Sequence, residues 1–222
     1  MNRKLLLLVL AQGLLLTNNI CFIAINGLVG LALAPQAWMA TLPICGYVAG
    51  GALFARLVGR HQLAWGRRRA FQVGLLVAMV SCALAGWAVW AHNFWGVVAA
   101  TVVAGYYNAN GALYRFAAVE LVAPERRETA ISWVLAGGCL GAAVGPWLAR
   151  ESKQLFITPF LGAYVLLIGV AVLGLVLISR IDFPALPQPV AGQTGRSSGE
   201  LMRQPVFLVA VLASALGYGV MN

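Results

Sequence analysis

Charged side chains are scarce in this sequence, and acidic ones are scarcer than basic ones. Charged residues make up 9% of the 222 positions, apolar residues make up 61%, and the mean hydropathy is +0.86. A soluble domain of this length could not keep so much apolar surface away from water, so the composition predicts a polytopic membrane protein embedded in a lipid bilayer. The net charge is +9. Because the basic residues stand between apolar runs rather than on one polar face, this charge does not predict nucleic-acid binding.

The sequence also lacks the clusters that metal sites and catalytic centres need. An integral-membrane enzyme would need clustered His, Asp or Glu inside the apolar runs, and the sequence has no such cluster. We therefore expect no enzymatic activity and no cofactor. The four cysteines fall inside apolar runs without zinc-finger spacing, and we interpret most of them as small helix-packing residues. They are Cys21, Cys45, Cys82 and Cys139.

Long apolar runs are abundant instead. Six are long enough to cross a bilayer as helices, and a seventh begins before the last residue. The expected spans are residues 5–33, 37–57, 70–91, 94–121, 130–148, 156–179 and 205–222. The first run is too long for the apolar core of a signal peptide, so we expect a retained helix. The pattern predicts an all-α membrane bundle over residues 1–180, a cytoplasmic linker over 181–204 and the start of a seventh helix at 205–222.

The segment of residues 55–69 sets the orientation, because it holds five arginines between two apolar runs. Guanidinium groups cannot lie in hydrocarbon, and arginine-rich short loops stay on the cytoplasmic side. In the resulting topology, 13 of the 15 basic residues lie inside. We expect a cytoplasmic amino terminus in a bacterial inner membrane. Arg115, near the inner interface, either snorkels to headgroups or pairs with Glu120 or the next loop.

Polar side chains at membrane depth gather in the first and fourth spans. Gln12, Asn19 and Asn26 recur every seven residues, which places them on one helical face with a slow drift. Such amides face protein or a water-filled cavity rather than lipid, so either interhelical hydrogen bonds or a cavity wall accounts for them. The third and sixth spans hold almost none and should face lipid. The candidate cavity residues are Asn18, Asn19, Tyr107, Asn108 and Asn110.

Glycines with helical spacing mark the expected close contacts between helices. Gly46 and Gly50 form a small-x3-small pair in the second span. In the fifth span the smooth strip consists of Gly137, Gly141 and Gly145, followed by Pro146, which can bend the helix.

Six spans, an inner linker and a further span resemble the amino-terminal half of a major facilitator superfamily transporter, over the whole chain. The resemblance implies two inverted three-helix repeats and a solute path shared with a second six-helix half. The family's inner loop reads Gly-x3-Asp-Arg-x-Gly-Arg-Arg, and four positions match: Gly59, Gly66, Arg67 and Arg68. Leu63 and Ala64 replace the Asp and Arg, which puts the usual gating charge network in question. Anchoring of the loop to anionic headgroups is the other role open to these arginines.

Two narrower resemblances concern the solute. Gly141, Gly145 and Pro146 resemble the antiporter signature, although Ala149 and Arg150 replace its following Gly-Gly. Residues 115–138 and the terminal GYGVMN resemble the CcoA-type copper-uptake branch, which carries a Met-x3-Met pair. The first methionine matches Met221. This resemblance implies copper as substrate, and thioethers and thiols are the soft ligands that Cu(I) prefers. The candidate metal ligands are Met221, Cys21 and Cys139.

Three functions remain open at this stage. The chain is a secondary transporter of copper, or a transporter or proton-coupled exporter of a small organic solute or drug, or a structural membrane module without transport. A structural module would not need in-line amides in the first and fourth spans. We expect the chain to be half of a functional unit, cut within the seventh span. Its partner is then the missing carboxy-terminal half or a second copy.

Overall fold

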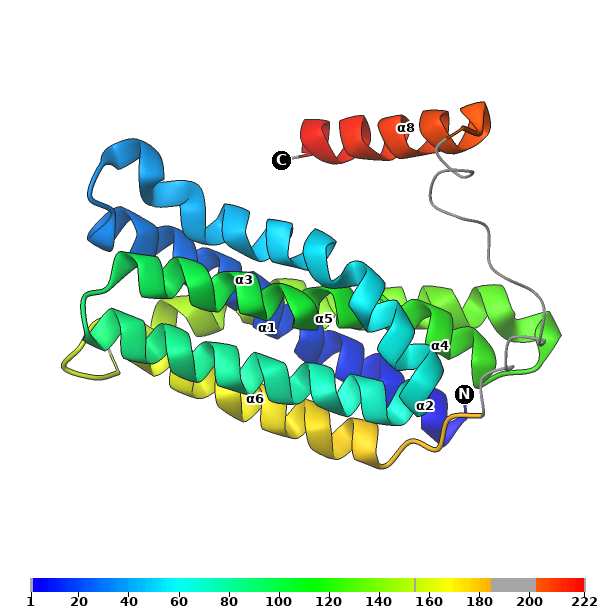
Figure 1. The fold of residues 1–222 in the computed structure, drawn as a ribbon. Coiled ribbons are helices and arrows are strands. Elements are labelled where there is room, and N and C mark those ends of the chain that lie inside the picture. The colour runs from blue at the N-terminus through cyan, green and yellow to red at the C-terminus, as the bar shows by residue number, and fades with distance from the viewer. Residues whose placement is uncertain (1, 154, 185–202, 222) are drawn as a thin grey trace. The chain divides into compact units, whose positions relative to one another are not determined.

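The structure, a computed structural model, describes residues 2–153, 155–184 and 203–221, with the side chains of the last helix described only in part. The chain separates into two compact units, Met1–Leu186 and Pro187–Asn222. Every regular element within the described residues is a helix (Figure 1). The expected all-α class is therefore confirmed.

The first unit is a bundle of long helices. Its elements are α1 (Arg3–Leu33), η1 (Ala37–Thr41), α2 (Leu42–Trp90), α3 (Phe94–Gly111), α4 (Tyr114–Glu120), η2 (Pro124–Arg126), α5 (Arg127–Ser152) and α6 (Leu161–Ser179). The second unit contains α8 (Pro205–Met221), an apolar helix that begins at a proline, as first-turn prolines often do. The boundaries follow the expected apolar runs within a few residues, except at the arginine-rich segment and in the fourth run.

The arginine-rich segment is not a loop, which corrects the interpretation of residues 55–69. α2 continues through it and turns only at Gly66, whose φ of 76° and ψ of 166° are not helical. Arginine is a good helix former and the segment contains no proline, so both helices extend beyond the apolar runs until a glycine permits the corner. We call residues 42–65 the first limb of α2 and residues 67–90 its second limb, which runs back toward the opposite end of the bundle (Figure 1).

The fourth expected run is also interrupted. α3 ends at Gly111 and α4 begins at Tyr114. Between them, the N–H of Leu113 donates to the carbonyl oxygen of Asn110 at 3.1 Å, which is the tighter pattern of a 3₁₀ turn. α4 then ends at Glu120, whose carboxylate reaches the α2 corner.

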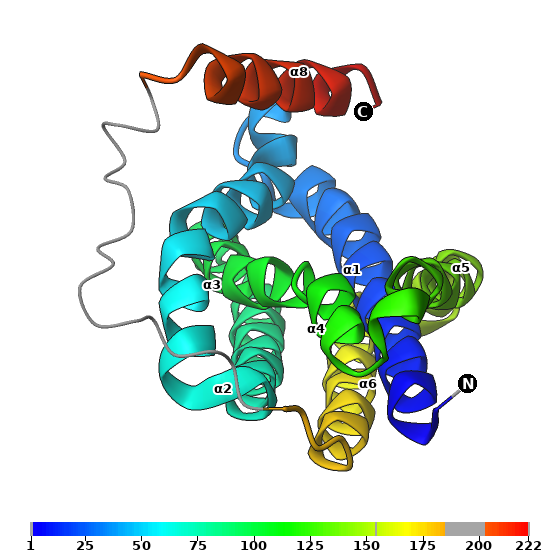
Figure 2. The same cartoon turned by 90° about the vertical axis from the view of Figure 1, so that its right-hand side faces the viewer.

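The connections between helices gather at two opposite ends of the first unit (Figures 1 and 2). One end holds the amino terminus, the Gly66 corner, the α4–α5 connection and the end of α6; we call it the arginine end. The other holds the α1–η1, α2–α3 and α5–α6 connections; we call it the tryptophan end. Arginines favour the cytoplasmic side and tryptophans the bilayer interface, so the two ends carry the chemistry of two membrane surfaces. The exposed tryptophans on elements near the second end are Trp38, Trp87, Trp90, Trp95 and Trp147.

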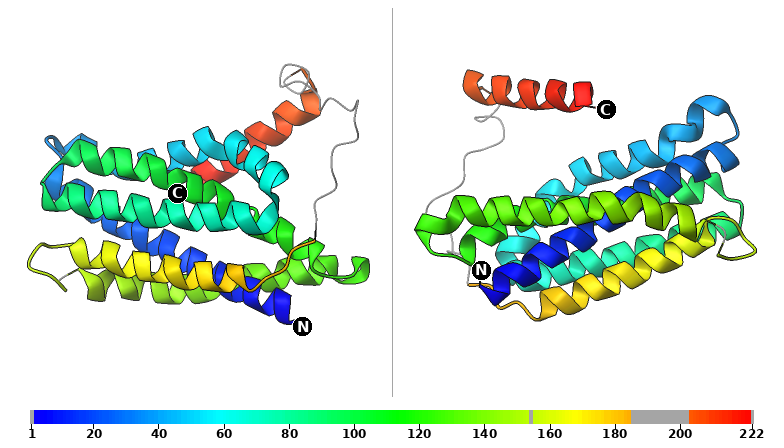
Figure 3. Two further views of the ribbon diagram at one scale, coloured as in Figure 1. Left: turned by 60° about the horizontal axis from the view of Figure 1, so that its bottom comes forward. Right: turned by 180° about the vertical axis from the view of Figure 1, so that it is seen from behind.

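Glycines make the closest helix contacts. α1 passes obliquely between α5 and α6 (Figure 3), and the glycine strip of α5 lies directly against it. A Cβ atom added to Gly141 would stand 2.5 Å from the backbone nitrogen of Thr17, and one added to Gly145 would stand 2.9 Å from the Cβ of Ile20. The first limb of α2 approaches α3 in the same way, at Gly50. Pro146 lies inside α5 and is exposed.

Four segments of the described chain are long and apolar enough to cross a membrane: Arg3–Leu33, Ala37–Trp90, Pro124–Ser152 and Leu161–Ser179. Each limb of α2 has 24 residues and is about 36 Å long, which exceeds the hydrocarbon core of a typical bilayer. α3 has 18 residues and carries two tyrosines and two asparagines in its second half.

Candidate functional site

A hydrogen-bonded chain of polar side chains joins three helices in the middle of the bundle. The hydroxyl of Tyr47 on the first limb of α2 donates to Oδ1 of Asn19 on α1, at 2.6 Å. Nδ2 of Asn19 donates to Oδ1 of Asn108 on α3, at 3.3 Å. We call Tyr47, Asn19 and Asn108 the central network. Two of its members were candidates from the sequence, and the structure brings them together.

The central network is buried at one side and open at the other. Tyr47 is 3% exposed, whereas Asn19 and Asn108 are half-buried. Asn108 uses its oxygen for Asn19, and its Nδ2 group contacts no acceptor in the part of the chain that the structure describes. Gly51 lies beside this group, since a Cβ added there would stand 3.3 Å from it. The Nδ2 group of Asn108 is therefore a free donor next to the Asn19–Asn108 hydrogen bond, and it can donate to a solute.

The other candidate cavity residues lie between helices. Asn18 is 2% exposed, and its Nδ2 donates to the carbonyl oxygen of Leu167 on α6 at 3.1 Å. Asn110 is also 2% exposed, and it donates to the carbonyl oxygen of Ala70 at 2.6 Å. Tyr107 is 4% exposed and belongs to an apolar core cluster. The structure does not place these three with the central network, and interhelical contact accounts for them.

Four aromatic side chains contact one another between the first limb of α2 and α3. Nδ1 of His61 lies 2.8 Å from the hydroxyl of Tyr106, and the His61 ring stacks on Trp65 with centroids 4.0 Å apart. Phe54 meets the edge of Tyr106 with centroids 6.0 Å apart. We call Phe54, His61, Trp65 and Tyr106 the aromatic group.

Sequence analysis missed most of this surface, although a signal was available. Tyr47, Phe54 and His61 recur every seven residues along the first limb, which places them on one helical face. The signal was hidden because residues 55–69 were interpreted as a loop, and a loop has no such face.

An ion pair at the arginine end ties the α2 corner to α4. Nη2 of Arg67 lies 2.7 Å from Oε1 of Glu120. Nη1 of Arg67 also donates to Oε1 of Gln62 at 3.3 Å, and Gln62 in turn donates to Oδ1 of Asn110 at 2.8 Å. The exposed Leu63 stands where the family motif has its aspartate, and Glu120 supplies a carboxylate to the motif arginine instead.

Two neighbouring arginines have other contacts. Arg68 pairs with the exposed Asp182 at 3.1 Å and also donates to the carbonyl oxygen of Ser179. The alternative in which Arg115 pairs with Glu120 is wrong, because Glu120 is paired with Arg67. The guanidinium of Arg115 lies over the ring of Phe116, 5.0 Å from its centroid.

Two of the candidate metal ligands, Cys21 and Cys139, lie in different environments. Cys21 is completely buried in a core cluster that also contains Cys82, whereas Cys139 is exposed on α5. The side chain of Met221 lies outside the described residues. Among the described residues, no group of three or more His, Cys, Asp or Glu could hold a metal ion.

Long apolar helices, with arginines at one end, tryptophans at the other and a half-open polar network between them, define an integral membrane helical bundle. The chain belongs to the Major Facilitator Superfamily, whose family model matches residues 5–222. It is therefore a transporter-family chain and not an enzyme.

One curated relative is similar along nearly the whole chain. The chain is 30% identical over 225 residues to the riboflavin transporter RfnT of Brucella anthropi. The match covers 99% of this chain and 56% of the relative, so the chain spans about half the length of that protein. The superfamily resemblance is thus confirmed, whereas the comparison does not support the copper-uptake branch.

Proposed function

We propose that this chain forms one half of an alternating-access secondary transporter that carries a flat, polar organic solute of the riboflavin class. Two observations carry the proposal: the half-open pair of Asn19 and Asn108, and the aromatic group on the first limb of α2 and α3. Riboflavin, the solute in the relative's name, combines a flat heteroaromatic ring with amide-type donors and acceptors. The amide pair can hydrogen-bond such a ring edge, and the aromatic group can stack on its face.

The topology that we propose has six membrane crossings: α1, the first limb of α2, its second limb, α3 with α4, α5 and α6. The arginine end is cytoplasmic, and the amino terminus therefore lies inside, in a bacterial inner membrane. Residues 1–180 make the first half, 181–204 the cytoplasmic linker, and 205–222 begin the seventh crossing. A second six-helix half, or a second copy of this chain, supplies the facing wall of the path.

The polar contacts at the arginine end support rigid-body movement of this half. In the proposed topology α1 and α2 form the first repeat, and α3 to α6 form the second. Arg67 with Glu120, Gln62 with Asn110, and Arg68 with the carbonyl oxygen of Ser179 each join one repeat to the other. Alternating access by rocking requires each half to move as one body, and these pairs couple the repeats. The motif arginines thus stabilise the half, in addition to any contact with headgroups.

The proposal is tested by riboflavin uptake into proteoliposomes that contain the full-length protein. The variant Asn108→Ala removes an amide at the solute surface, so we expect KM to rise about tenfold, the effect of roughly 1.4 kcal/mol in binding. The control variant Asn18→Ala removes an amide that only contacts Leu167, and its KM should stay unchanged. Equal KM values for both variants, or no riboflavin uptake by the parent protein, would refute the proposal.

The resemblance around Met221 implies copper uptake. Among the described residues, no cluster of candidate metal ligands supports that function. The same proteoliposomes give a direct comparison, because copper can be measured beside riboflavin. Copper uptake without riboflavin uptake would replace the flavin proposal with the copper one.

A further inference from the structure

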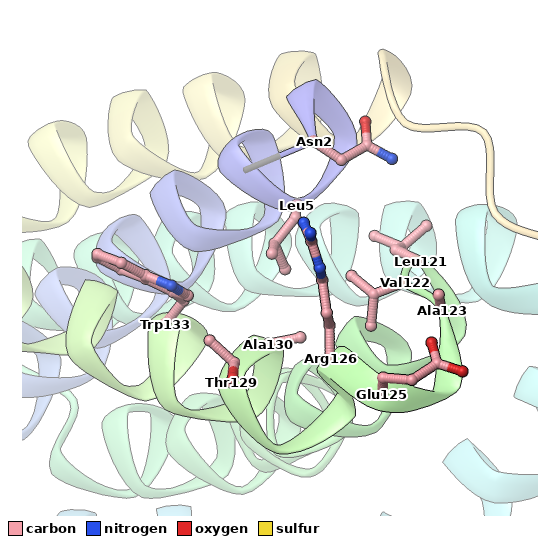
Figure 4. A pocket seen from close by; sticks show the side chains of 10 residues that line it. All are labelled: Asn2, Leu5, Leu121, Val122, Ala123, Glu125, Arg126, Thr129, Ala130 and Trp133. Atoms are coloured by element: carbon pink, nitrogen blue, oxygen red, sulfur yellow. The ribbon is translucent and has the colours of Figure 1, made fainter.

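A pocket opens at the arginine end, where α1, the α4–α5 connection and α5 meet. Its volume is about 560 Å³. Leu5 of α1 and Asn2, the residue that caps this helix, form one side, and α5 with the preceding connection forms the other (Figure 4). None of these residues belongs to the central network or to the aromatic group, so this pocket is separate from the proposed solute site.

The charge in the pocket comes from Arg126. Its side chain rises between Leu5 and Val122, with the guanidinium directed toward Asn2, while the carboxylate of Glu125 is turned to the side (Figure 4). The ion pairs found in the described residues do not include Arg126. Three further basic residues lie nearby in the sequence, and they leave this corner of the bundle positive: Arg3, Lys4 and Arg127.

The rest of the pocket is amphipathic. Leu5, Leu121 and Ala130 are buried at its inner side, and Trp133 stands at its edge with 50% of its surface exposed. An indole in this position is typical of the boundary between headgroups and hydrocarbon. A ligand that fills the pocket therefore needs an anionic group at one side and apolar atoms at the other.

A second hollow on α1 and α5 is apolar. This groove of about 450 Å³ lies between α1, α5 and α6, and its lining, which includes Leu10, Leu140, Val144 and Leu173, is almost entirely hydrocarbon. The one hydroxyl in the lining, on Thr17, donates to the carbonyl oxygen of Gly13 at 2.9 Å, so the groove presents no free hydroxyl donor. An aliphatic chain fits such a surface better than any polar ligand does.

The pocket and the groove share one face of α5. Trp133 and Leu140 lie seven residues apart on α5, so their side chains project from the same face, about 10 Å apart along the helix. Arg126, the residue directly before α5, lines the same pocket as Trp133. The order along this face is a cation, an interfacial indole and then hydrocarbon, which is the order of groups in a phospholipid that enters from the inner leaflet.

We propose that this face binds one anionic phospholipid of the inner leaflet. Its phosphate lies against Arg126, its glycerol region beside Trp133, and one acyl chain along the groove of α1, α5 and α6. This assignment rests on the cytoplasmic placement of the arginine end that we proposed above. It does not depend on the identity of the transported solute.

The test is a titration of the full-length protein in detergent, followed by native mass spectrometry. The two lipids are phosphatidylglycerol and phosphatidylcholine with identical acyl chains. We expect one phosphatidylglycerol to bind preferentially, and Arg126→Gln to weaken its binding about fivefold, the effect of one basic residue near an anionic surface. The matched control is Arg127→Gln. It removes the same charge at the next residue, whose side chain does not line the pocket. This variant should bind phosphatidylglycerol nearly as well as the parent protein does.

The groove is tested independently with a second pair of variants. Val144→Phe fills the groove, whereas Ala143→Phe places the same side chain at the neighbouring exposed residue, which does not line the groove. Only the first should weaken phosphatidylglycerol binding. Inorganic phosphate in excess should not displace the lipid, because it cannot occupy the groove.

Several results would overturn the lipid assignment. These are equal binding of the two lipids, equal effects of the two arginine variants, displacement by phosphate, or no retained lipid because the second half covers this face. Riboflavin uptake measured on the same protein separates this failure from failure of the transport proposal. A protein that takes up riboflavin but retains no lipid refutes only the lipid site.

Discussion

α1 meets its neighbours in two contrasting ways. Toward α5 it contacts backbone and small side chains, at Gly137 and Gly141, with almost no space between the helices. Toward α3 and the first limb of α2 it makes side-chain hydrogen bonds, from Asn19 to Asn108 and from Tyr47 to Asn19. One side of the helix is therefore a close steric fit, and the other is a set of polar groups next to an open surface.

The difference shows which contacts hold the half together and which are available for a solute. A glycine contact is stabilised by dispersion over many atoms, and any added side chain must displace backbone. A hydrogen bond between membrane helices contributes less, about 0.6 kcal/mol on average, because its groups find other partners when it breaks. We therefore expect the largest stability effects on the α5 side and the largest transport effects on the α3 side.

The largest effect is expected for Gly141→Leu. A Cβ there would stand 2.5 Å from the backbone nitrogen of Thr17, so α1 and α5 would have to separate. We expect a loss of about 3 kcal/mol or more in the free energy of unfolding, since overpacking of this kind moves backbone. Unfolding titration of the full-length protein in mixed micelles measures it. Gly169→Leu on α6 is the control, because nothing lies within 4 Å of its added Cβ; equal losses would contradict the steric account.

A glycine can also be required because its backbone conformation excludes other residues, even where no neighbouring atom is close. Gly66 is such a position. No atom lies within 4 Å of a Cβ added at Gly66, but its φ of 76° and ψ of 166° fall in a region essentially confined to glycine. Gly66→Ala should lower the free energy of unfolding by about 2 kcal/mol through strain alone. Gly59→Ala, with equal space and a position inside a helix, should be neutral or slightly stabilising. A larger loss of stability from Gly59→Ala than from Gly66→Ala would contradict the glycine-specific backbone conformation at the α2 corner.

On the polar side, Asn18 and Asn108 separate stability from transport. Asn18→Ala removes a buried bond to the carbonyl oxygen of Leu167, so we expect a loss of about 1 kcal/mol in the free energy of unfolding. Asn108→Ala acts at a half-buried site where water replaces the amide, and its loss should be smaller. Thermal unfolding and riboflavin uptake, measured on the same preparations, should therefore rank the two variants in opposite orders.

The smallest effect is expected for the ion pair of Arg68 and Asp182. Both side chains are exposed, at 46% and 76%. Asp182→Asn should change the free energy of unfolding by about 0.5 kcal/mol or less, as exposed pairs usually do. Glu120→Gln, which breaks the more buried pair with Arg67, serves as the comparison and should cost more. A larger loss from Asp182→Asn would mean that the exposed pair contributes more to stability than the contact between the α2 corner and α4.

Much of the fold could be predicted from the sequence, because apolar length and charge placement decide it locally. The helical runs, the glycine strip at Gly137, Gly141 and Gly145 and the concentration of arginines at one end all follow from composition and spacing. The course of residues 55–69 could not be predicted correctly. Arginine content indicates that a segment lies outside hydrocarbon, but it does not distinguish a loop from a helix that continues into water.

The site was only partly predictable for a geometric reason. Asn18 and Asn19 are adjacent, so their side chains differ by about 100° around α1. The sequence shows two amides, but the rotation of α1 against α5 and α6 decides which amide is buried against Leu167 and which faces Asn108. Such rotation is set by packing against neighbouring helices and not by local sequence. His61 was missed for a related reason, because its partner Tyr106 is 45 residues away.

The central claim is that Asn108 lies at the surface of the solute path, and substrate protection of a cysteine there tests it most directly. In the full-length protein without native cysteines, Asn108→Cys should react with a water-soluble thiol reagent, and riboflavin should slow the reaction. Asn18→Cys should react slowly, with or without riboflavin. Equal reactivity at the two positions, or a rate at Asn108→Cys that riboflavin leaves unchanged, would contradict the account.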